Sequence, residues 1–141
     1  MRRSIVVLVT AVAALTIMGC SQPAVSQPAA SFGGATAVPG TSWVLRDLSG
    51  VTLGTGVPTI DFGTDGTVSG SAGCNTFNGT YTVEGSSISF GPLASTKMAC
   101  PEADMAVETA FLAGLAGATS WSIQAEMLKL EGASTLNFTP A

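Results

Sequence analysis

Turn-forming residues interrupt this chain so often after residue 40 that it can build only short strands and one longer helix. Segment 59–62 (TIDF) alternates polar and apolar residues, segment 63–66 (GTDG) is typical of a hairpin turn, and the alternation resumes at 67–70. An Asn-Gly pair at 78–79 indicates another turn. The pattern predicts strands at residues 42–48, 59–62, 67–70, 80–83, 87–90, 121–123, 127–130 and 135–138.

One segment, residues 101–116 (PEADMAVETAFLAGLA), has the period of a helix. Pro101 suits the first helical position, where no backbone donor is needed. Glu102 and Asp104 fall in the first turn, where the helix dipole favours negative charge. The apolar residues expected on the inner face are Val107, Phe111 and Leu115, with Met105 and Leu112 widening the stripe.

Short strands and a single helix in a segment of this length predict a mainly β domain. Tight turns favour antiparallel pairing, and a sheet that curls into a barrel removes its exposed edges. We expect a small antiparallel, barrel-like curled sheet of about seven or eight strands, with the helix covering one end or one face. Trp43, Tyr81, Trp121 and the phenylalanines would form its core. The alternative is that they line a pocket for one apolar ligand.

The first twenty residues differ from the rest of the chain. Two arginines precede an apolar run over residues 5–18, as in a secretory signal. Segment 17–20 (IMGC) resembles the bacterial lipobox, whose cysteine is lipidated and becomes the mature N-terminus. Residues 21–40 are uncharged and rich in Ser, Pro, Ala and Gly, which is typical of a flexible tether. We expect a lipoprotein signal peptide at 1–19, lipidated Cys20 and a tether at 20–40, and one domain at 41–141. The alternative is an ordinary signal in which Cys20 has no role.

Removal of the signal peptide would leave an acidic protein. Three basic residues, Arg46, Lys97 and Lys129, then stand against nine acidic ones, so the formal net charge becomes −6. Such a chain lacks the basic patch that nucleic acids require. We therefore expect no nucleic-acid partner, and we expect any membrane attachment to come from acyl chains on Cys20.

Two motifs point to a known family. They are GCNTFNGTY at 73–81 and LASTKMACP at 93–101, and they occur with SWVLRDL at 42–48 and a Glu108-x-x-Phe111-x-x-x-Leu115 helix. In this order they resemble the META domain, the family of the bacterial heat-shock protein HslJ. The resemblance implies a barrel-like sheet with one helix, and an exported or lipid-anchored protein linked to envelope stress. It implies no enzymatic activity, catalytic residue or cofactor. The motif residues taken as structural are Gly73, Asn75, Asn78, Gly79, Tyr81, Thr96 and Pro101.

One of the three cysteines is the candidate for lipidation, and the other two can form a disulfide. If Cys20 is lipidated, Cys74 and Cys100 remain, and an exported small domain is where a disulfide persists and contributes most. A bridge between them would attach the start of the helix to the sheet. The alternative is two separate buried thiols that pack as small apolar groups.

Catalytic chemistry has little support from the residue types. The chain has no histidine, which removes Cys-His and Ser-His pairs and the usual zinc ligand sets. A nucleophilic Cys74 would need another base, such as Lys97. Turns and the helix start explain most of the carboxylates considered as acid pairs, which are Asp61, Asp65, Glu84, Glu102, Asp104 and Glu108. Segment 61–70 lacks the spacing of a calcium loop, and a turn is favoured over a glycosylation site at residues 78–80. We expect no metal.

The sequence thus predicts a lipid-anchored, extracytoplasmic, non-enzymatic binding or interaction module that supports the cell envelope or stress tolerance. Two alternatives are kept. One is a carrier for a small apolar ligand inside the barrel. The other is an inhibitor that presents loops at the barrel end to a secreted hydrolase.

Overall fold

The computed structural model describes residues 37–141. The predicted signal peptide, Cys20 and most of the predicted tether lie outside the described residues. Within the described part there are nine strands and one helix. The elements are β1 (Ser42–Leu48), β2 (Thr59–Phe62), β3 (Thr67–Ser71), β4 (Thr76–Glu84), β5 (Ser87–Phe90), β6 (Ala94–Ser95), α1 (Glu102–Ala116), β7 (Ala118–Gln124), β8 (Met127–Gly132) and β9 (Thr135–Pro140).

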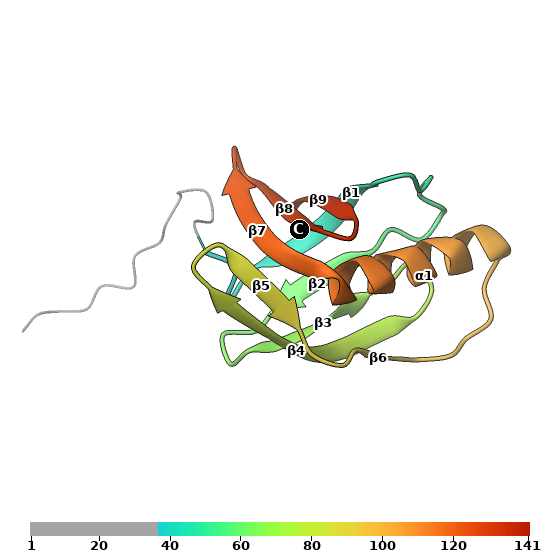
Figure 1. Ribbon diagram of the computed structural model, residues 1–141. Coiled ribbons are helices and arrows are strands. Elements are labelled where there is room, and N and C mark those ends of the chain that lie inside the picture. The colour runs from blue at the N-terminus through green and yellow to red at the C-terminus, as the bar shows by residue number, and fades with distance from the viewer. Residues whose placement is uncertain (1–36) are drawn as a thin grey trace, which may run out of the picture. The chain divides into compact units, whose positions relative to one another are not determined.

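The sheet closes into a barrel. Its strand order is β3-β2-β1-β9-β8-β7-β5-β4-β6, and an additional pairing of β3 with β4 closes the ring of eight strands. All pairings are antiparallel. The ninth strand, β6, pairs only with β4 and continues the line of β5 along it (Figure 1). The predicted antiparallel barrel is therefore confirmed, with one short strand more than expected.

Side chains fill the barrel interior. Trp43, Leu45, Ile60, Leu128 and Phe138 each expose no more than 1 % of their surface. Val38, within the segment expected to be a tether, is also fully buried. Phe62 and Tyr81 pack edge to face with ring centroids 4.9 Å apart, an arrangement that aromatic pairs favour. The aromatic residues expected in the core are mostly there.

The helix α1 packs against one end of the barrel and leads directly into β7 (Figure 1). Its predicted inner residues Val107, Phe111 and Leu115 are all completely buried. The ring of Phe111 lies between those of Phe77 and Phe138, with centroid distances of 5.7 and 6.3 Å. Pro101 lies one residue before the first helical residue rather than at it, a difference within the usual variation of helix boundaries.

The sides of the helical stripe differ from the prediction. Met105 and Leu112 are only partly buried, whereas Asp104 and Glu108 are buried, with 6 % and 5 % of their surface exposed. Residues 104, 108, 111 and 115 follow one another on one face of a helix. The two carboxylates tolerate burial there because each accepts hydrogen bonds from the barrel.

The turn predicted at Asn78-Gly79 is wrong. Both residues lie inside β4, and the chain turns earlier, where the Ala72 N–H donates to the Asn75 carbonyl at 2.7 Å. A Cβ at Gly79 would lie 2.7 Å from Leu93 Cδ2 and 2.9 Å from the Pro92 carbonyl oxygen. Gly79 therefore allows the segment before β6 to approach β4 closely, and its role is close packing rather than a turn.

Candidate functional site

Asn75 is the centre of a buried polar network. It lies in the turn between β3 and β4 and is fully buried. Its Nδ2 donates to Glu108 Oε2 at 2.9 Å and Oε1 at 3.2 Å, and to the Met98 carbonyl at 3.2 Å. Its Oδ1 accepts from the Met98 N–H at 2.7 Å and from Thr96 Oγ1 at 2.9 Å. One amide thus connects the turn, the segment after β6 and the helix.

Glu108 accepts a further bond from the backbone of the same turn. The Asn75 N–H donates to Glu108 Oε2 at 3.0 Å. Both carboxylate oxygens are therefore directed at one residue of the turn. A carboxylate with its oxygens engaged in this way stabilises the attachment of α1 to the barrel.

The predicted disulfide is present beside this network. Cys74 and Cys100 are bonded, with their Cα atoms 6.1 Å apart, inside the range of 4.4–6.8 Å that the bond allows. It joins the β3–β4 turn to the residue before Pro101, so it fixes the entrance of the helix as expected. The bond also leaves neither sulfur as a thiolate nucleophile, which removes the catalytic interpretation of Cys74 with Lys97.

Asp104 attaches a second loop to the start of the helix. Its Oδ1 accepts from the Thr55 N–H at 2.9 Å and the Gly56 N–H at 3.2 Å, and its Oδ2 accepts from Thr55 Oγ1 at 2.9 Å. The backbone hydrogen bond from Gly56 and the side-chain bond from Thr55 hold the pKa of Asp104 below its ordinary value. The helix dipole alone was expected to explain this residue. The structure adds a long-range role.

The other acidic candidates do not assemble into a site. Asp65 accepts from the Thr67 N–H at 3.0 Å and from Thr67 Oγ1 at 2.6 Å, and these bonds lower its pKa. This is the turn role predicted for it. Asp61, Glu84 and Glu102 are exposed on separate elements. Among residues 37–141, no three Asp, Glu, Cys or His side chains are grouped so that they could hold a metal ion.

The polar groups of Tyr81 and Trp121 also form hydrogen bonds that hold parts of the barrel together. Tyr81 lies in the core and its hydroxyl donates to the Gly63 carbonyl at 2.7 Å. Trp121 is half-buried, and its Nε1–H donates to the Gly85 carbonyl at 2.9 Å, across the seam where β5 and β7 pair only at Ser87 and Ser120. Tyr81 belongs to the core cluster of the barrel, and Trp121 packs against that cluster. The carrier alternative loses its main argument, because side chains occupy the barrel interior.

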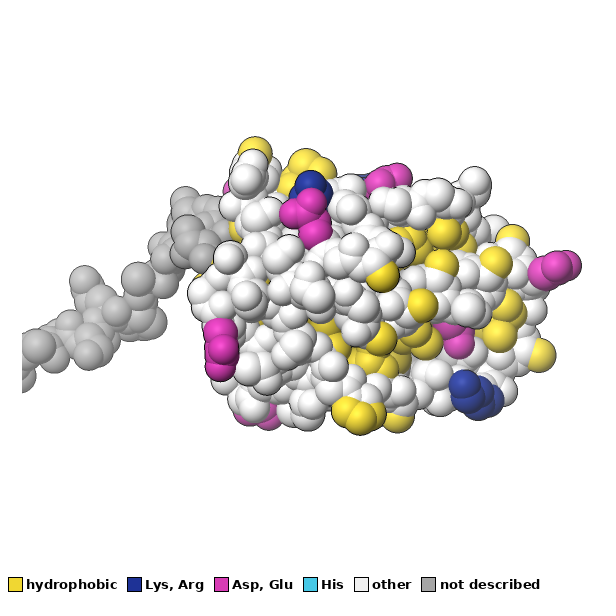
Figure 2. Space-filling model, viewed as in Figure 1, with side chains coloured by type: hydrophobic (Ala, Val, Ile, Leu, Met, Phe, Trp, Pro, Cys, Tyr) yellow, Lys and Arg dark blue, Asp and Glu magenta, His cyan; other side chains and the backbone are white. Residues whose placement is uncertain are grey.

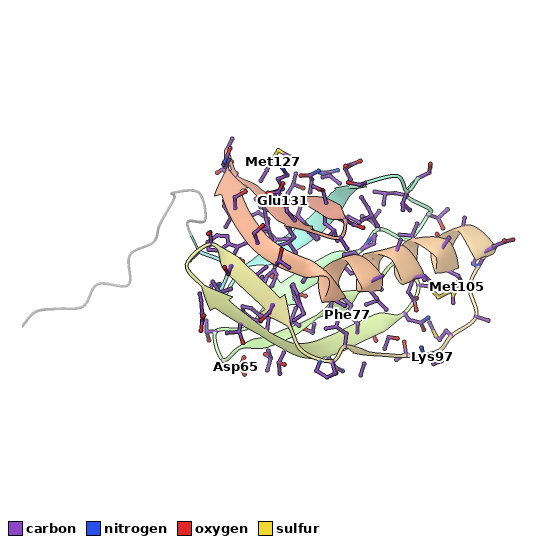
Figure 3. All side chains as sticks on the ribbon, in the orientation of Figure 1. Asp65, Phe77, Lys97, Met105, Met127 and Glu131 are labelled. Atoms are coloured by element: carbon purple, nitrogen blue, oxygen red, sulfur yellow. A yellow bond between two sulfur atoms is a disulfide. The ribbon has the colours of Figure 1, made fainter. Side chains whose placement is uncertain are left out.

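A surface hollow adjoins the Asn75 network. Its volume is about 510 Å³, and we call it the helix groove because α1 forms one wall and the segment 97–99 forms the other. Figure 2 shows apolar side chains gathered along the helix on this face, and Figure 3 shows Met105 on α1 and Lys97 on the segment that passes beneath it. The residues that line the helix groove are Asn75, Lys97, Met98, Ala99, Met105, Glu108, Thr109 and Leu112.

Met98 is the most exposed large apolar side chain of the described residues, at 61 %. An exposed methionine at the rim of an apolar hollow is typical of adaptable binding surfaces. The helix groove was not predicted from the sequence. A sequence signal for it was nevertheless present. Met105 and Leu112 are apolar residues of the helix that lie to one side of the buried stripe Val107, Phe111 and Leu115.

The predicted structural motif divides into two groups. Gly73, Asn75, Thr96 and Pro101 surround the disulfide and the Asn75 network, and Gly73 has a φ of 109°, a conformation that favours glycine. Asn78, Gly79 and Tyr81 lie farther along β4. The motif residues therefore attach the helix and the segment after β6 to β4 and to the turn that precedes it.

Fold and site together define a small closed antiparallel barrel whose single helix is attached to one end by a disulfide and two buried carboxylates. The barrel-like sheet with one helix is the fold that the family resemblance implied. The META domain model matches residues 36–141, and the chain belongs to the META domain family.

Solved structures share this fold. An NMR structure of a protein from Burkholderia xenovorans is 26 % identical, with a TM-score of 0.65 over 74 % of this chain and 83 % of that chain. A second NMR structure is also 26 % identical, with a TM-score of 0.61 over 73 % of this chain and 91 % of that chain. A crystal structure of a DUF4847 family protein from Bacteroides vulgatus ATCC 8482 shares the fold, with 16 % identity and a TM-score of 0.57 over 72 % of this chain and 93 % of that chain.

No curated protein gave a significant match to the sequence. The META domain family is not known for an enzymatic activity. Across residues 37–141, the one helix is too short and too polar to cross a membrane.

Proposed function

We propose that the chain is a lipid-anchored, extracytoplasmic interaction module of the cell envelope that works without catalysis. One observation carries the proposal. The side chains of Asn75, Asp104 and Glu108 bind other parts of the same chain, while the helix groove beside them presents an exposed Met98 and partly exposed Met105 and Leu112. Chemistry needs polar groups that are available to a substrate, whereas binding needs an accessible apolar surface.

The proposed location is supported by the sequence and by the disulfide. Residues 1–19 have the pattern of a secretory signal, and 17–20 resembles a lipobox. The Cys74–Cys100 bond belongs to an oxidising compartment, because cytosolic thiols are kept reduced. Two or more acyl chains on Cys20 would anchor the protein stably, since each buried methylene contributes about 0.8 kcal/mol.

The anchor is tested by fractionation of the native host. Wild-type protein should sediment with membranes and should incorporate a labelled fatty acid. Cys20→Ala should appear in soluble fractions or accumulate as the unprocessed precursor. A Cys20→Ala protein that fractionates and migrates like the wild type would remove the anchor from the proposal.

The interaction surface is tested by photocrosslinking in intact cells. A photoreactive amino acid at Met98 should give a discrete adduct with an envelope protein, because this side chain stands at the rim of the helix groove. The matched control is the same probe at Met127, which is 44 % exposed but starts β8, outside the groove. Adducts that are absent at both positions, or equal at both, would contradict the proposed surface. A secreted hydrolase in the Met98 adduct would identify the module as an inhibitor.

A further inference from the structure

The chain segment that follows β6 is hydrogen-bonded to the barrel through alternate residues. The Thr96 N–H donates to the Thr76 carbonyl at 3.0 Å. Two residues later, both backbone groups of Met98 bind the Asn75 side chain. Successive residues of an extended chain direct their backbone groups to opposite sides. Lys97 and Ala99 therefore turn theirs away from the barrel, toward the side on which no strand lies.

Those outward groups have no partner in the part of the chain that the structure describes. Neither Lys97 nor Ala99 donates or accepts a backbone hydrogen bond among residues 37–141. Both residues are exposed. β6 ends the strand order of the sheet, so the segment that continues it has an outer side with which a further strand can pair.

The helix supplies an apolar wall opposite this edge. Met105, Thr109 and Leu112 follow one another at spacings of four and three, so they form one stripe along α1. All three line the same hollow as Lys97, Met98 and Ala99, and its volume of about 510 Å³ lies in the range of about 300–1,000 Å³ found for binding pockets. A sheet edge beside an apolar helix face is a geometry that can receive an extended peptide.

Both walls are held in place before any ligand arrives. The disulfide ends the edge segment at Cys100, and Asn75 connects the middle of that segment to Glu108 on the helix. A groove whose walls are fixed loses little conformational entropy on binding. The hydrogen bonds of the Asn75 network therefore have two roles. They attach the helix to the barrel, and they set the width of the helix groove.

We propose that the helix groove binds an extended segment of a partner protein as an added antiparallel or parallel strand on the outer side of residues 95–99. Its backbone would pair with Lys97 and Ala99, and one apolar side chain would enter between Met98, Met105 and Leu112. This inference deepens the proposed interaction module and rests on it.

The chemistry of the groove selects this occupant. Added strands are recognised through main-chain hydrogen bonds, with pockets for alternate side chains providing specificity. An acyl chain would leave the Lys97 and Ala99 backbone groups without partners, and a helical ligand has no backbone groups to offer them. Lys97 is exposed in the lining of the groove, whereas Glu108 is buried and bonded to Asn75, so the segment should be neutral or acidic where it passes Lys97.

A peptide selection tests the proposal. The full-length protein, with its disulfide intact, is immobilised and presented with a phage-displayed library of random dodecapeptides. We expect enriched peptides to alternate apolar and polar residues and to bind the Met127→Lys variant as they bind the wild type. Met105→Lys should weaken them by about tenfold or more, because it places a charge in the apolar wall.

A proline substitution tests the backbone pairing itself. Lys97→Pro removes the outward N–H, while the inward bonds of Thr96 and Met98 need no change. Lys97→Ala is the matched control, because it removes the same side chain and keeps the N–H. The selected peptides should lose about tenfold in affinity to Lys97→Pro and little to Lys97→Ala. N-methylation of the peptide nitrogens that face residues 95–99 should abolish binding, whereas N-methylation of the alternate nitrogens, which face away, should not.

Three results would overturn the inference. One is a selection that yields no peptide able to distinguish wild type from Met105→Lys. Another is equal binding of the selected peptides to Lys97→Pro and Lys97→Ala, with unchanged melting temperatures. The third is displacement of a groove-bound apolar dye by a fatty acid when no peptide binds, which would show an acyl-chain site. Adducts at Met98 that persist in such cases would leave the interaction module standing with a different mode of contact.

Discussion

Replacing Asn75 by alanine should destabilise the domain more than most single substitutions. The change removes the amide bonds to Glu108, to both backbone groups of Met98 and to Thr96. A hydrogen bond to a charged group contributes about 1.5–3 kcal/mol and a neutral one about 0.5–1.5 kcal/mol. Water can replace the amide at Met98, which is exposed, but it reaches Glu108 poorly, because that side chain is only 5 % exposed.

The expected loss is therefore about 3–5 kcal/mol, a large part of the roughly 5–15 kcal/mol that keeps a typical domain folded. The melting temperature should fall by roughly 12–25 °C. Urea denaturation of the purified protein, followed by the fluorescence of Trp43 and Trp121, measures the free energy of unfolding directly.

The same motif provides a matched control. Asn78 lies three residues farther along, is exposed, and should tolerate alanine within about 0.5 kcal/mol. A double-mutant cycle with Glu108→Ala should show a coupling of at least about 1 kcal/mol with Asn75. If Asn75→Ala costs under about 1 kcal/mol, or no more than Asn78→Ala, the buried network does not hold the helix and the reasoning is refuted.

Three further outcomes follow from the structure. Replacing Cys74 and Cys100 together by serine should cost about 3.5 kcal/mol, because the bond closes a loop of 26 residues; an unchanged urea midpoint would show that the bond adds no stability. Phe111→Ala should cost about 3–5 kcal/mol, since the ring is fully buried between two others; a melting temperature within error of wild type would contradict this packing. The lowered pKa of Asp104 means that its contribution to stability is complete above the ordinary carboxyl value of 3.8 and is lost as the pH falls through the lower pKa of the folded protein. Asp104→Asn should therefore lose less stability on acidification below that pH than the wild type, and parallel acid titrations of the two proteins would argue against the bonds to Thr55 and Gly56.

Much of the fold was predictable, because its signals are local. Strands such as 59–62 and 67–71 alternate clearly, and the stripe at Val107, Phe111 and Leu115 marks the helix face. β6 has only two residues and no alternation to detect. The Asn-Gly pair at 78–79 indicated a turn, but the requirement for glycine there comes from Leu93 and Pro92, which only the tertiary structure brings near.

The candidate site was predictable only in part, because its partners are far apart in sequence. The disulfide followed from counting cysteines, since one pair remained after Cys20. The buried carboxylates did not, because Asp104 meets Thr55 across 49 positions and Glu108 meets Asn75 across 33. No local pattern distinguishes a carboxylate that binds a distant loop from an ordinary acidic residue at the start of a helix. The helix groove depends on the same long-range contacts.

The central claim is that the Asn75 network stabilises the fold whereas the helix groove binds a partner. The substitution Met105→Lys tests this claim most directly. The melting temperature of this variant is measured on the purified protein. Its crosslinking through a photoreactive residue at Met98 is measured in the cells that produce it. Because Met105 is only partly buried at the edge of the helix stripe, we expect the melting temperature to stay within a few degrees of the wild type, while the Met98 adduct disappears. An adduct of unchanged yield in a stably folded Met105→Lys protein would contradict the account.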